Sequence, residues 1–445
     1  MLMKNRRILA IIMVIAISIC AVGCGGASKN TDKGSTGKKP AGAQTDYFDD
    51  VPAELDGTTV KFATWIDHNS NESAQVLADF TDITGINVEL VSVSQMDYIT
   101  KLSGLIASGD APDVIVCNSE WPRILSLLTP LDETKIDTKD TFWNQDVIAN
   151  YTVGGKPYLV NVKGGAWDMA SGCVVYNNRI FEDNGITTPA LYLQEGRWTL
   201  DNFFKAAQEL KSVCKEAGVG IATGTYLTAY ADGFATWDAA NGKFVSNIKN
   251  TDFINAWQKL VSARDAGYAK VNDDGARYLF ENESMGMVLT GSYGLRKSGW
   301  FQAMDIDDLG FIELPRVDAN GEEVYSATSD RGYGICKGAK NPDGAAYFLR
   351  YFLDANNYDP DELYKNEECA ELYKKLQNTN KNMGCSAAIF SILGTSDKPM
   401  YDIFPDLKNC TASQIQTALA SGENTFNACI ERANAMIEGA KSENQ

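Results

Sequence analysis

Histidine is nearly absent from this chain of 445 residues, because His68 is the only one. A catalytic triad with a histidine base needs that side chain beside its nucleophile. Structural zinc sites combine cysteines and histidines at short spacings, but no two of the ten cysteines are separated by just two residues. We therefore expect no histidine-based triad, no structural metal and no cofactor.

Basic residues and long apolar runs are also scarce. The chain has 40 Lys and Arg against 58 Asp and Glu, which gives a net charge of −18. Nucleic-acid binders need a basic surface, so nucleic acid is not an expected partner. After residue 23 no apolar stretch is long enough to span a bilayer. These features indicate a soluble, acidic body.

The first 23 residues have the layout of a bacterial secretion signal. A basic start and an apolar run over residues 8–19 lead to small residues just before Cys24. This arrangement resembles the lipobox of bacterial lipoproteins, in which the cysteine becomes the lipidated first residue of the mature chain. Ala21 stands where that motif usually has leucine, and an ordinary secretory peptide is the alternative. Both interpretations place the mature chain outside the cytoplasm.

Residues 24–54 are expected to form a lipidated cysteine and a flexible linker. The stretch 25–44 is rich in Gly, Ser, Thr, Lys and Ala and contains no branched aliphatic or aromatic side chain. Such a segment buries too little apolar surface to offset the entropy lost on ordering. We expect it to tether a globular body to the membrane.

Eight cysteines follow the signal and Cys24. An even number outside the cytoplasm permits disulfides, and the pairs nearest in sequence are Cys369/Cys385 and Cys410/Cys429. Buried free thiols are the alternative, because sequence alone does not fix the pairing.

The body, from about residue 55 to 439, is too long for a single core and predicts two lobes. Its start alternates between strands at 59–65, 86–91 and 114–116 and helices at 73–84 and 97–108, with Gly85 ending the first helix. This alternation is typical of a parallel sheet covered by helices. One further helix is predicted to begin after Thr199, which would be its N-cap, and another is predicted to begin at residue 341.

Several segments resemble the bacterial extracellular solute-binding proteins of family 1, which serve ABC importers of sugars. They occur in the family's order and include "YITKLSGLIASGDAPDVI", "VVYNNRIFEDNGITTP", "FENESMGMVLTGSYGLR" and "GYGICKGAKNPDGAAYFLRYFL". The resemblance implies an α/β, two-lobed periplasmic-binding-protein-like fold of type II, with a ligand cleft between lobes joined by a multi-crossing hinge. The lobes would comprise residues 55–164 with 295–353, and 165–294 with 354–445.

Candidate ligand-binding residues are aromatic and polar side chains, several of them near strand ends, because sugars need stacking rings and paired hydrogen bonds. Ligands of α/β sheets lie beyond the carboxyl ends of strands. The predicted set is Trp65, Asp67, Asn118, Glu120, Trp167, Trp237, Asp238, Tyr293 and Arg331.

Each candidate also has a structural alternative. Trp65 fits a core position closing the sheet, and Asn118 with Glu120 fits a solvated turn. Arg331 stands where relatives often have glycine; its guanidinium suits vicinal hydroxyls or the carboxylate of an acidic sugar. The alternative for Arg331 is an ion pair with Asp330 or Glu120.

The predicted function is a monomeric receptor, held by its lipid at the extracellular face of the membrane, that passes a carbohydrate to ABC permease subunits. It is not expected to be an enzyme. A secreted glycoside hydrolase, which needs two carboxylates flanking the scissile bond, is one alternative. The same fold with a peptide or a polyamine as ligand is another.

Overall fold

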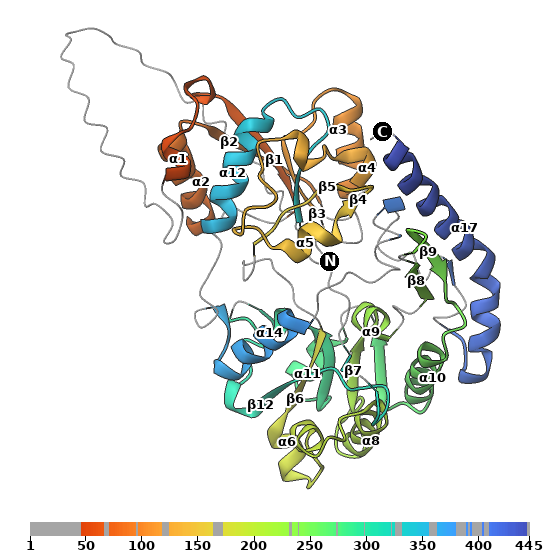
Figure 1. Cartoon of the computed structure of the whole chain (residues 1–445). Coiled ribbons are helices and arrows are strands. Elements are labelled where there is room, and N and C mark those ends of the chain that lie inside the picture. Colours follow the sequence, from red (N-terminus) through yellow and green to blue (C-terminus); the bar gives the residue numbers. More distant parts are fainter. Residues whose placement is uncertain are drawn as a thin grey trace, which may run out of the picture. The chain divides into compact units, whose positions relative to one another are not determined.

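Two α/β sheets organise the part of the chain described by the computed structural model (Figure 1). The structure describes residues 46–65, 71–94, 97–117, 124–162, 172–230, 234–238, 240–272, 275–297, 299–321, 323–324, 332–355, 363–379, 389, 392–393, 403–404 and 409–442. The predicted signal and Cys24 lie outside these residues, as does most of the predicted linker.

The first sheet has the strand order β13-β3-β1-β2. Its strands are β1 (Thr59–Thr64), β2 (Asn87–Ser92), β3 (Val114–Cys117) and β13 (Gly332–Ile335). β1 is parallel to β2 and β3, whereas β13 is antiparallel to β3. Helices α2 (Asn71–Thr84) and α12 (Pro342–Ala355) lie on one face, and α3 (Tyr98–Ala107) and α4 (Ile124–Leu127) on the other (Figure 1). The alternation of strands and helices predicted for this region is confirmed.

Local chemistry explains how these elements begin and end. Gly85 ends α2 with a φ of 74°, a left-handed conformation that other residues adopt only with strain. The buried carboxylate of Asp113 accepts hydrogen bonds from the main-chain N–H groups of Lys61 at 2.8 Å and Asn341 at 2.7 Å. This carboxylate therefore joins β1 to the start of α12, where the sequence predicted a helix.

The second sheet has the order β10-β7-β11-β6-β12. Its strands are β6 (Gly172–Asn177), β7 (Val219–Ala222), β10 (Ala269–Asn272), β11 (Met287–Gly291) and β12 (Leu309–Glu313). β7, β10 and β11 run parallel, and β6 is antiparallel to both β11 and β12.

Helices cover both faces of this sheet, so β6, β7 and β12 are buried at every residue. Val174 packs in a core shared with α8 (Leu200–Lys211) and α9 (Thr223–Tyr230). Its neighbour Val175 packs on the other face with α11 (Arg277–Glu281) and α14 (Glu367–Thr379). The hydroxyl of Thr199 accepts from the N–H of Asn202 at 3.4 Å, which confirms the predicted N-cap of α8.

The strand pairing divides the segment 295–353, which was assigned to the first lobe. β12 pairs with β6 of the second sheet, whereas β13 pairs with β3 of the first. The chain therefore passes to the first sheet after β12 and before β13. The remaining lobe boundaries stay predictions.

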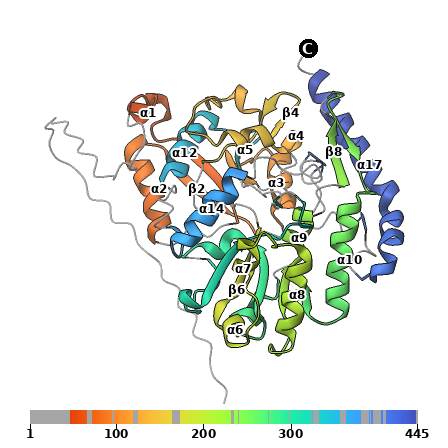
Figure 2. The same cartoon turned by 60° about the horizontal axis from the view of Figure 1, so that its bottom comes forward.

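The remaining elements include two long helices, α10 (Thr251–Asp265) and α17 (Ile415–Ser442). The others are short: the helices α1 (Asp46–Asp49), α5 (Gln145–Asn150), α6 (Asn178–Asp183) and α7 (Pro189–Gln194), the 3-10 helices Ala53–Leu55, Leu131–Glu133, Ser292–Leu295, Ile306–Asp308 and Ala412–Gln414, and the hairpins β4 (Thr152–Val153) with β5 (Lys156–Pro157) and β8 (Ala235–Asp238) with β9 (Lys243–Ser246). In Figures 1 and 2, α17 lies beside α10 and the β8–β9 hairpin.

Seven cysteines fall in the described part of the chain, and all carry free thiols: Cys117, Cys173, Cys214, Cys336, Cys369, Cys410 and Cys429. The Cys410/Cys429 disulfide that the sequence permits is therefore not formed in this structure. The suggested Cys369 partner, Cys385, lies outside the described residues. Burial raises the pKa of Cys336 and of Cys369 to about 12 and that of Cys214 to about 11.

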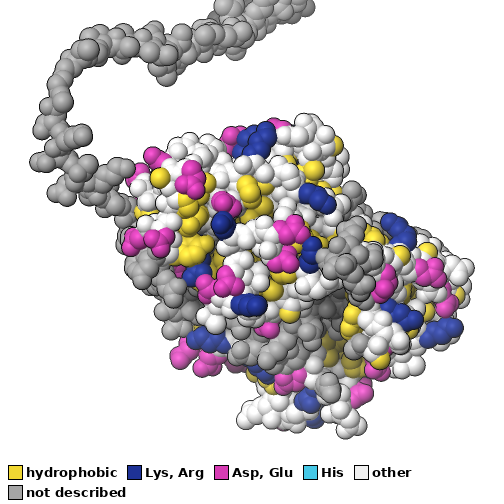
Figure 3. Space-filling model, turned by 45° about the horizontal axis from the view of Figure 1, so that its top comes forward, with side chains coloured by type: hydrophobic (Ala, Val, Ile, Leu, Met, Phe, Trp, Pro, Cys, Tyr) yellow, Lys and Arg dark blue, Asp and Glu magenta, His cyan; other side chains and the backbone are white. Residues whose placement is uncertain are grey.

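The surface mixes charges of both signs. On the face seen in Figure 3, acidic and basic side chains are interspersed, with apolar side chains between them. Among the described residues, none of the helices combines the length and the apolar character needed to cross a bilayer.

Candidate functional site

The carboxyl ends of the parallel strands define one edge of each sheet. In the first sheet β1, β2 and β3 end at Thr64, Ser92 and Cys117. The antiparallel strand β13 begins at this same edge, because Gly332 pairs with Cys117. Main-chain groups and loops at such edges are where α/β sheets bind ligands. We call this the first carboxyl edge.

The second carboxyl edge is built in the same way. β7, β10 and β11 end there at Ala222, Asn272 and Gly291, and β12 ends there at Glu313. The antiparallel strand β6 begins at this edge, since Gly172 pairs with Gly291. The buried carboxylate of Glu313 accepts a hydrogen bond from the Lys375 ammonium at 2.6 Å.

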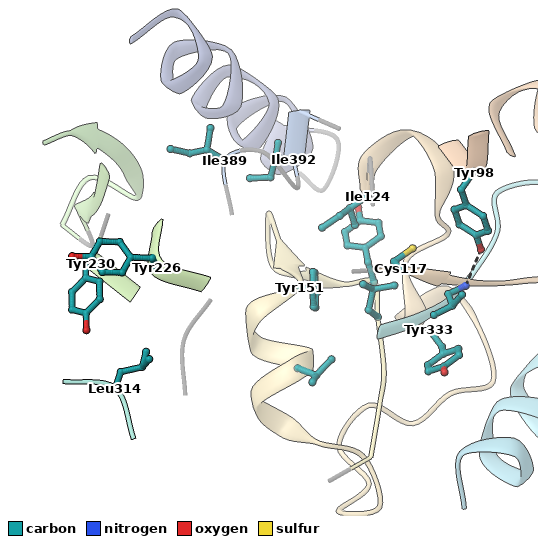
Figure 4. Packing of buried hydrophobic residues seen from close by; sticks show 14 of the residues in the cluster. Tyr98, Cys117, Ile124, Tyr151, Tyr226, Tyr230, Leu314, Tyr333, Ile389 and Ile392 are labelled. Atoms are coloured by element: carbon teal, nitrogen blue, oxygen red, sulfur yellow. Dashed lines mark hydrogen bonds between the residues drawn. The ribbon is translucent and has the colours of Figure 1, made fainter. Parts of the chain in front are cut away.

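Trp65 lies at the first carboxyl edge, directly after β1. It is half-buried, and its ring packs edge-on against that of Tyr98, with the centroids 4.8 Å apart. The hydroxyl of Tyr98 donates to the carbonyl of Ala63 at 2.8 Å and accepts from the N–H of Val116 at 3.3 Å. Figure 4 shows Tyr98 with a hydrogen bond of its hydroxyl as a dashed line. Tyr98 thus links β1 to β3 and supports Trp65, which keeps part of its surface exposed.

Tyr293 lies at the second carboxyl edge, two residues after β11. Its ring packs edge-on against that of Trp300, with the centroids 5.4 Å apart. The guanidinium carbon of Arg277 lies 3.8 Å from the centroid of Trp300, well within cation–π distance. This edge therefore presents two aromatic rings and a cation in one cluster.

Trp237 and Asp238 lie at neither edge, because they belong to the separate β8–β9 hairpin. The Trp237 side chain is 44% exposed and packs against Phe244. Asp238 accepts hydrogen bonds within its own turn from Asn241 and Ala240. The hydrogen bond from the Asn241 side chain is the main reason why the pKa of Asp238 is lowered. In this structure its carboxylate shapes the hairpin turn, and its role as a ligand contact stays a prediction.

Five predicted contacts lie outside the described residues: Asp67, Asn118, Glu120, Trp167 and Arg331. The described sequence neighbours of two of them nevertheless mark the first carboxyl edge. Asn118 follows Cys117 directly, and Arg331 immediately precedes Gly332. The structure therefore supports the predicted strand ends, while the side chains themselves remain predictions.

Sequence patterns do not point to Arg277 as a member of the site. Arg277 and Trp300 are 23 residues apart in the sequence and belong to different elements. They meet only because α11 packs on the sheet near the end of β11. No regular spacing links Arg277 to Trp300, so the sequence offers no signal for this contact.

A separate hollow of about 620 Å³ lies between α8 and α10. Its lining is mostly polar, with an ion pair between Lys259 and Asp201 at its border. It is formed by helix surfaces rather than strand ends, so we do not place the ligand site there. Within the described ranges, no three potential metal ligands gather at one place.

Comparison with known proteins identifies the family. The sequence profile of the bacterial extracellular solute-binding proteins matches residues 66–358, which is more than half of the chain. No curated protein matches the sequence.

Solved structures show the same fold. The galacto-N-biose/lacto-N-biose I-binding protein of an ABC transporter from Bifidobacterium longum has a TM-score of 0.59 and 15% identity, over 84% of this chain and 98% of that one. The GacH receptor of Streptomyces glaucescens, solved unliganded and with acarbose, has a TM-score of 0.57 and 15% identity over the same shares. A binding protein from B. animalis subsp. lactis in complex with β-1,6-galactobiose has a TM-score of 0.59 and 16% identity, again over 84% and 98%.

These likenesses confirm the predicted α/β, periplasmic-binding-protein-like fold. The family match extends through both sheets, from the end of β1 to the end of α12. The chain therefore belongs to the family of bacterial extracellular solute-binding proteins.

Proposed function

We propose that this protein is a membrane-tethered receptor that captures a carbohydrate outside the cell and delivers it to an ABC importer. The observation that carries the proposal is the placement of aromatic rings at strand ends. Trp65 stands at the carboxyl edge of the first sheet and Tyr293 at that of the second. Aromatic faces stack on the C–H faces of sugar rings, while nearby polar groups bond to the hydroxyls.

Delivery follows from a ligand that contacts both lobes. Such a ligand favours the conformation in which both sets of contacts form, to the extent of its higher affinity for that conformation. A permease that recognises the liganded conformation then receives loaded receptors. Binding and release suffice for this role, so the proposed protein is not an enzyme and works as a monomer.

The proposed lipid on Cys24 confines the receptor near its permease. Tethering raises the effective concentration of the receptor at the membrane without any new contact. Cys24 lies outside the described residues, so its support is the sequence pattern alone. Replacing Cys24 with serine should release the protein from the membrane with unchanged ligand affinity. Retention of the variant at the membrane would contradict the anchor.

A thermal-stability screen tests the ligand class. A ligand that binds only the folded protein, at about 100 times its dissociation constant, adds about 2.7 kcal/mol to the unfolding free energy. We expect at least one oligosaccharide to raise the melting temperature, and we expect no shift with peptides or polyamines. A shift with those solutes alone would reject carbohydrate as the ligand.

The same ligands test the alternative of a glycoside hydrolase. Each stabilising oligosaccharide is incubated with the protein, and reducing ends are then assayed. We expect none above the level of a heat-denatured control. Steady release of reducing ends would replace the receptor assignment with hydrolysis.

A further inference from the structure

Backbone strain is concentrated around α11. Among the residues that the structure describes, three non-glycine residues have a left-handed backbone: Ala276 with φ 51°, Glu283 with φ 60° and Phe301 with φ 65°. Ala276 precedes α11, Glu283 follows it, and Phe301 packs against it. Such residues persist only where their surroundings hold them, and they cluster at ligand clamps and active sites.

Specific contacts hold two of these strained positions. The N–H of Ala276 donates to the side-chain oxygen of Asn272 at 2.6 Å. The N–H of Phe301 donates to the Glu281 carboxylate at 3.2 Å, and its ring packs edge-on against Phe280 with the centroids 5.2 Å apart. The loops before α11 and after Gly299 are therefore fixed to each other through α11.

These two strained residues adjoin the cation–π pair at the second carboxyl edge. Ala276 directly precedes Arg277, and Phe301 directly follows Trp300. The Trp300 ring also lies over the end of β11, because a methyl group added at Gly291 would lie 3.9 Å from it. Both members of the pair are half-buried. The strain thus positions a guanidinium on an aromatic ring beside Tyr293.

We propose that Arg277 is a specificity-determining contact of the ligand site, an inference that rests on the proposed function. Trp300 covers one face of its guanidinium, so the N–H donors project within the plane of the group. A planar fork of this kind matches two adjacent oxygen atoms. On a sugar, those atoms are either the carboxylate of an acidic residue or two vicinal hydroxyls of a neutral one.

The test compares Arg277→Lys and Arg277→Gln with wild type in calorimetric titrations of the purified full chain. Arg277→Lys keeps the charge but removes the fork, whereas Arg277→Gln removes both. The matched control is Arg197→Gln, since Arg197 also stacks on a ring, 5.1 Å from the centroid of Tyr192, but lies outside the cluster of Arg277, Tyr293 and Trp300. Melting temperatures without ligand are measured in parallel, and the oligosaccharides include one that contains a uronate and its neutral counterpart.

We expect both Arg277 variants to bind the best oligosaccharide at least about tenfold more weakly, because hydrogen bonds to a charged group are lost. Arg197→Gln should bind within twofold of wild type. A wild-type preference for the uronate that Arg277→Gln abolishes identifies the carboxylate as the partner, and an equal loss for both sugars identifies vicinal hydroxyls.

The inference is overturned if both variants bind as wild type does, or if they lose melting temperature while the folded protein keeps its affinity. Those results would leave Arg277 as a structural residue and the receptor function intact. Failure of the wild type to bind any carbohydrate would instead overturn the proposed function and this inference together.

Discussion

The side chain of Asn434 forms hydrogen bonds to both main-chain groups of Phe244. Its oxygen accepts from the N–H at 2.8 Å, and its amide nitrogen donates to the carbonyl at 2.9 Å. One residue of α17 thus pairs with β9 as a neighbouring strand would. This contact satisfies an edge of the β8–β9 hairpin that presents Trp237.

Replacing Asn434 with alanine should lower the free energy of unfolding by about 1–3 kcal/mol, because two partly buried main-chain groups lose their partners. Urea unfolding measures the effect. The control is Asn424→Ala, since Asn424 is an exposed residue of the same helix. Equal stability of the two variants would show that the Asn434 contact contributes nothing.

A buried arginine connects α12 to the loop before α5. Arg350 pairs with Asp140, and its guanidinium carbon lies 3.9 Å from the centroid of Phe142. The Arg350 side chain is 8% exposed and that of Asp140 is 31% exposed. Replacing Arg350 with methionine should lower the unfolding free energy by about 2–3 kcal/mol. This loss is smaller than the loss from breaking a fully buried ion pair, because Asp140 remains accessible to water.

This pair should also make stability depend on pH. Burial alone would raise the pKa of Asp140, but the hydrogen bonds from Arg350 and from the main-chain N–H of Phe142 outweigh burial, so the pKa lies below its ordinary value of 3.8. A carboxyl group with a lowered pKa stabilises the folded state above that ordinary value, and this stabilisation is lost as the pH falls through the folded-state pKa.

The stability difference between wild type and Asp140→Asn should therefore be largest near neutral pH and shrink below about pH 4. Urea unfolding at several pH values between 7 and 3 measures it. Asp82→Asn, at an exposed position of α2, serves as the control and should show a smaller difference at neutral pH. A difference for Asp140→Asn that stays constant down to pH 3 would contradict the assigned role.

The buried thiols should resist modification in the folded protein. Burial raises the pKa of Cys117 and Cys173 far above the ordinary value, and the thiolate is the reactive form. At pH 8 an aromatic disulfide reagent should modify neither residue without denaturant and both within minutes in denaturant. Mass spectrometry of peptides identifies the modified cysteines. Fast modification in the native state, or a Cys410–Cys429 disulfide, would contradict this structure.

Local sequence signals predicted the first sheet well. The alternating pattern predicted β1, α2, β2, α3 and β3 to within two residues at every end, because apolar periodicity and Gly85 act over a few residues. The sequence pattern also placed Trp65 at the end of a strand, and the family resemblance placed Tyr293 just beyond one. Elements and strand ends depend on local chemistry, so both could be predicted.

Contacts between distant segments could not be predicted in this way. The pairing of β12 with β6 joins residues more than 130 positions apart, and nothing in residues 309–313 distinguishes one sheet from the other. The hydrogen bonds of Asp238 within the hairpin turn could likewise not be predicted from the adjacent Trp and Asp, whose suggested contact with a sugar stays a prediction. The Arg277–Trp300 contact depends on left-handed residues that the sequence does not reveal.

The most direct test of the receptor account is a calorimetric titration of the best oligosaccharide into wild type and into Trp65→Ala and Tyr293→Ala. Leu191→Ala, which alters an exposed apolar residue of α7, is the control. We predict one site in the wild type, at least about a tenfold loss of affinity in each edge variant because stacking is lost, and no loss in the control. Wild-type affinity in both edge variants would contradict a carbohydrate site at the two carboxyl edges.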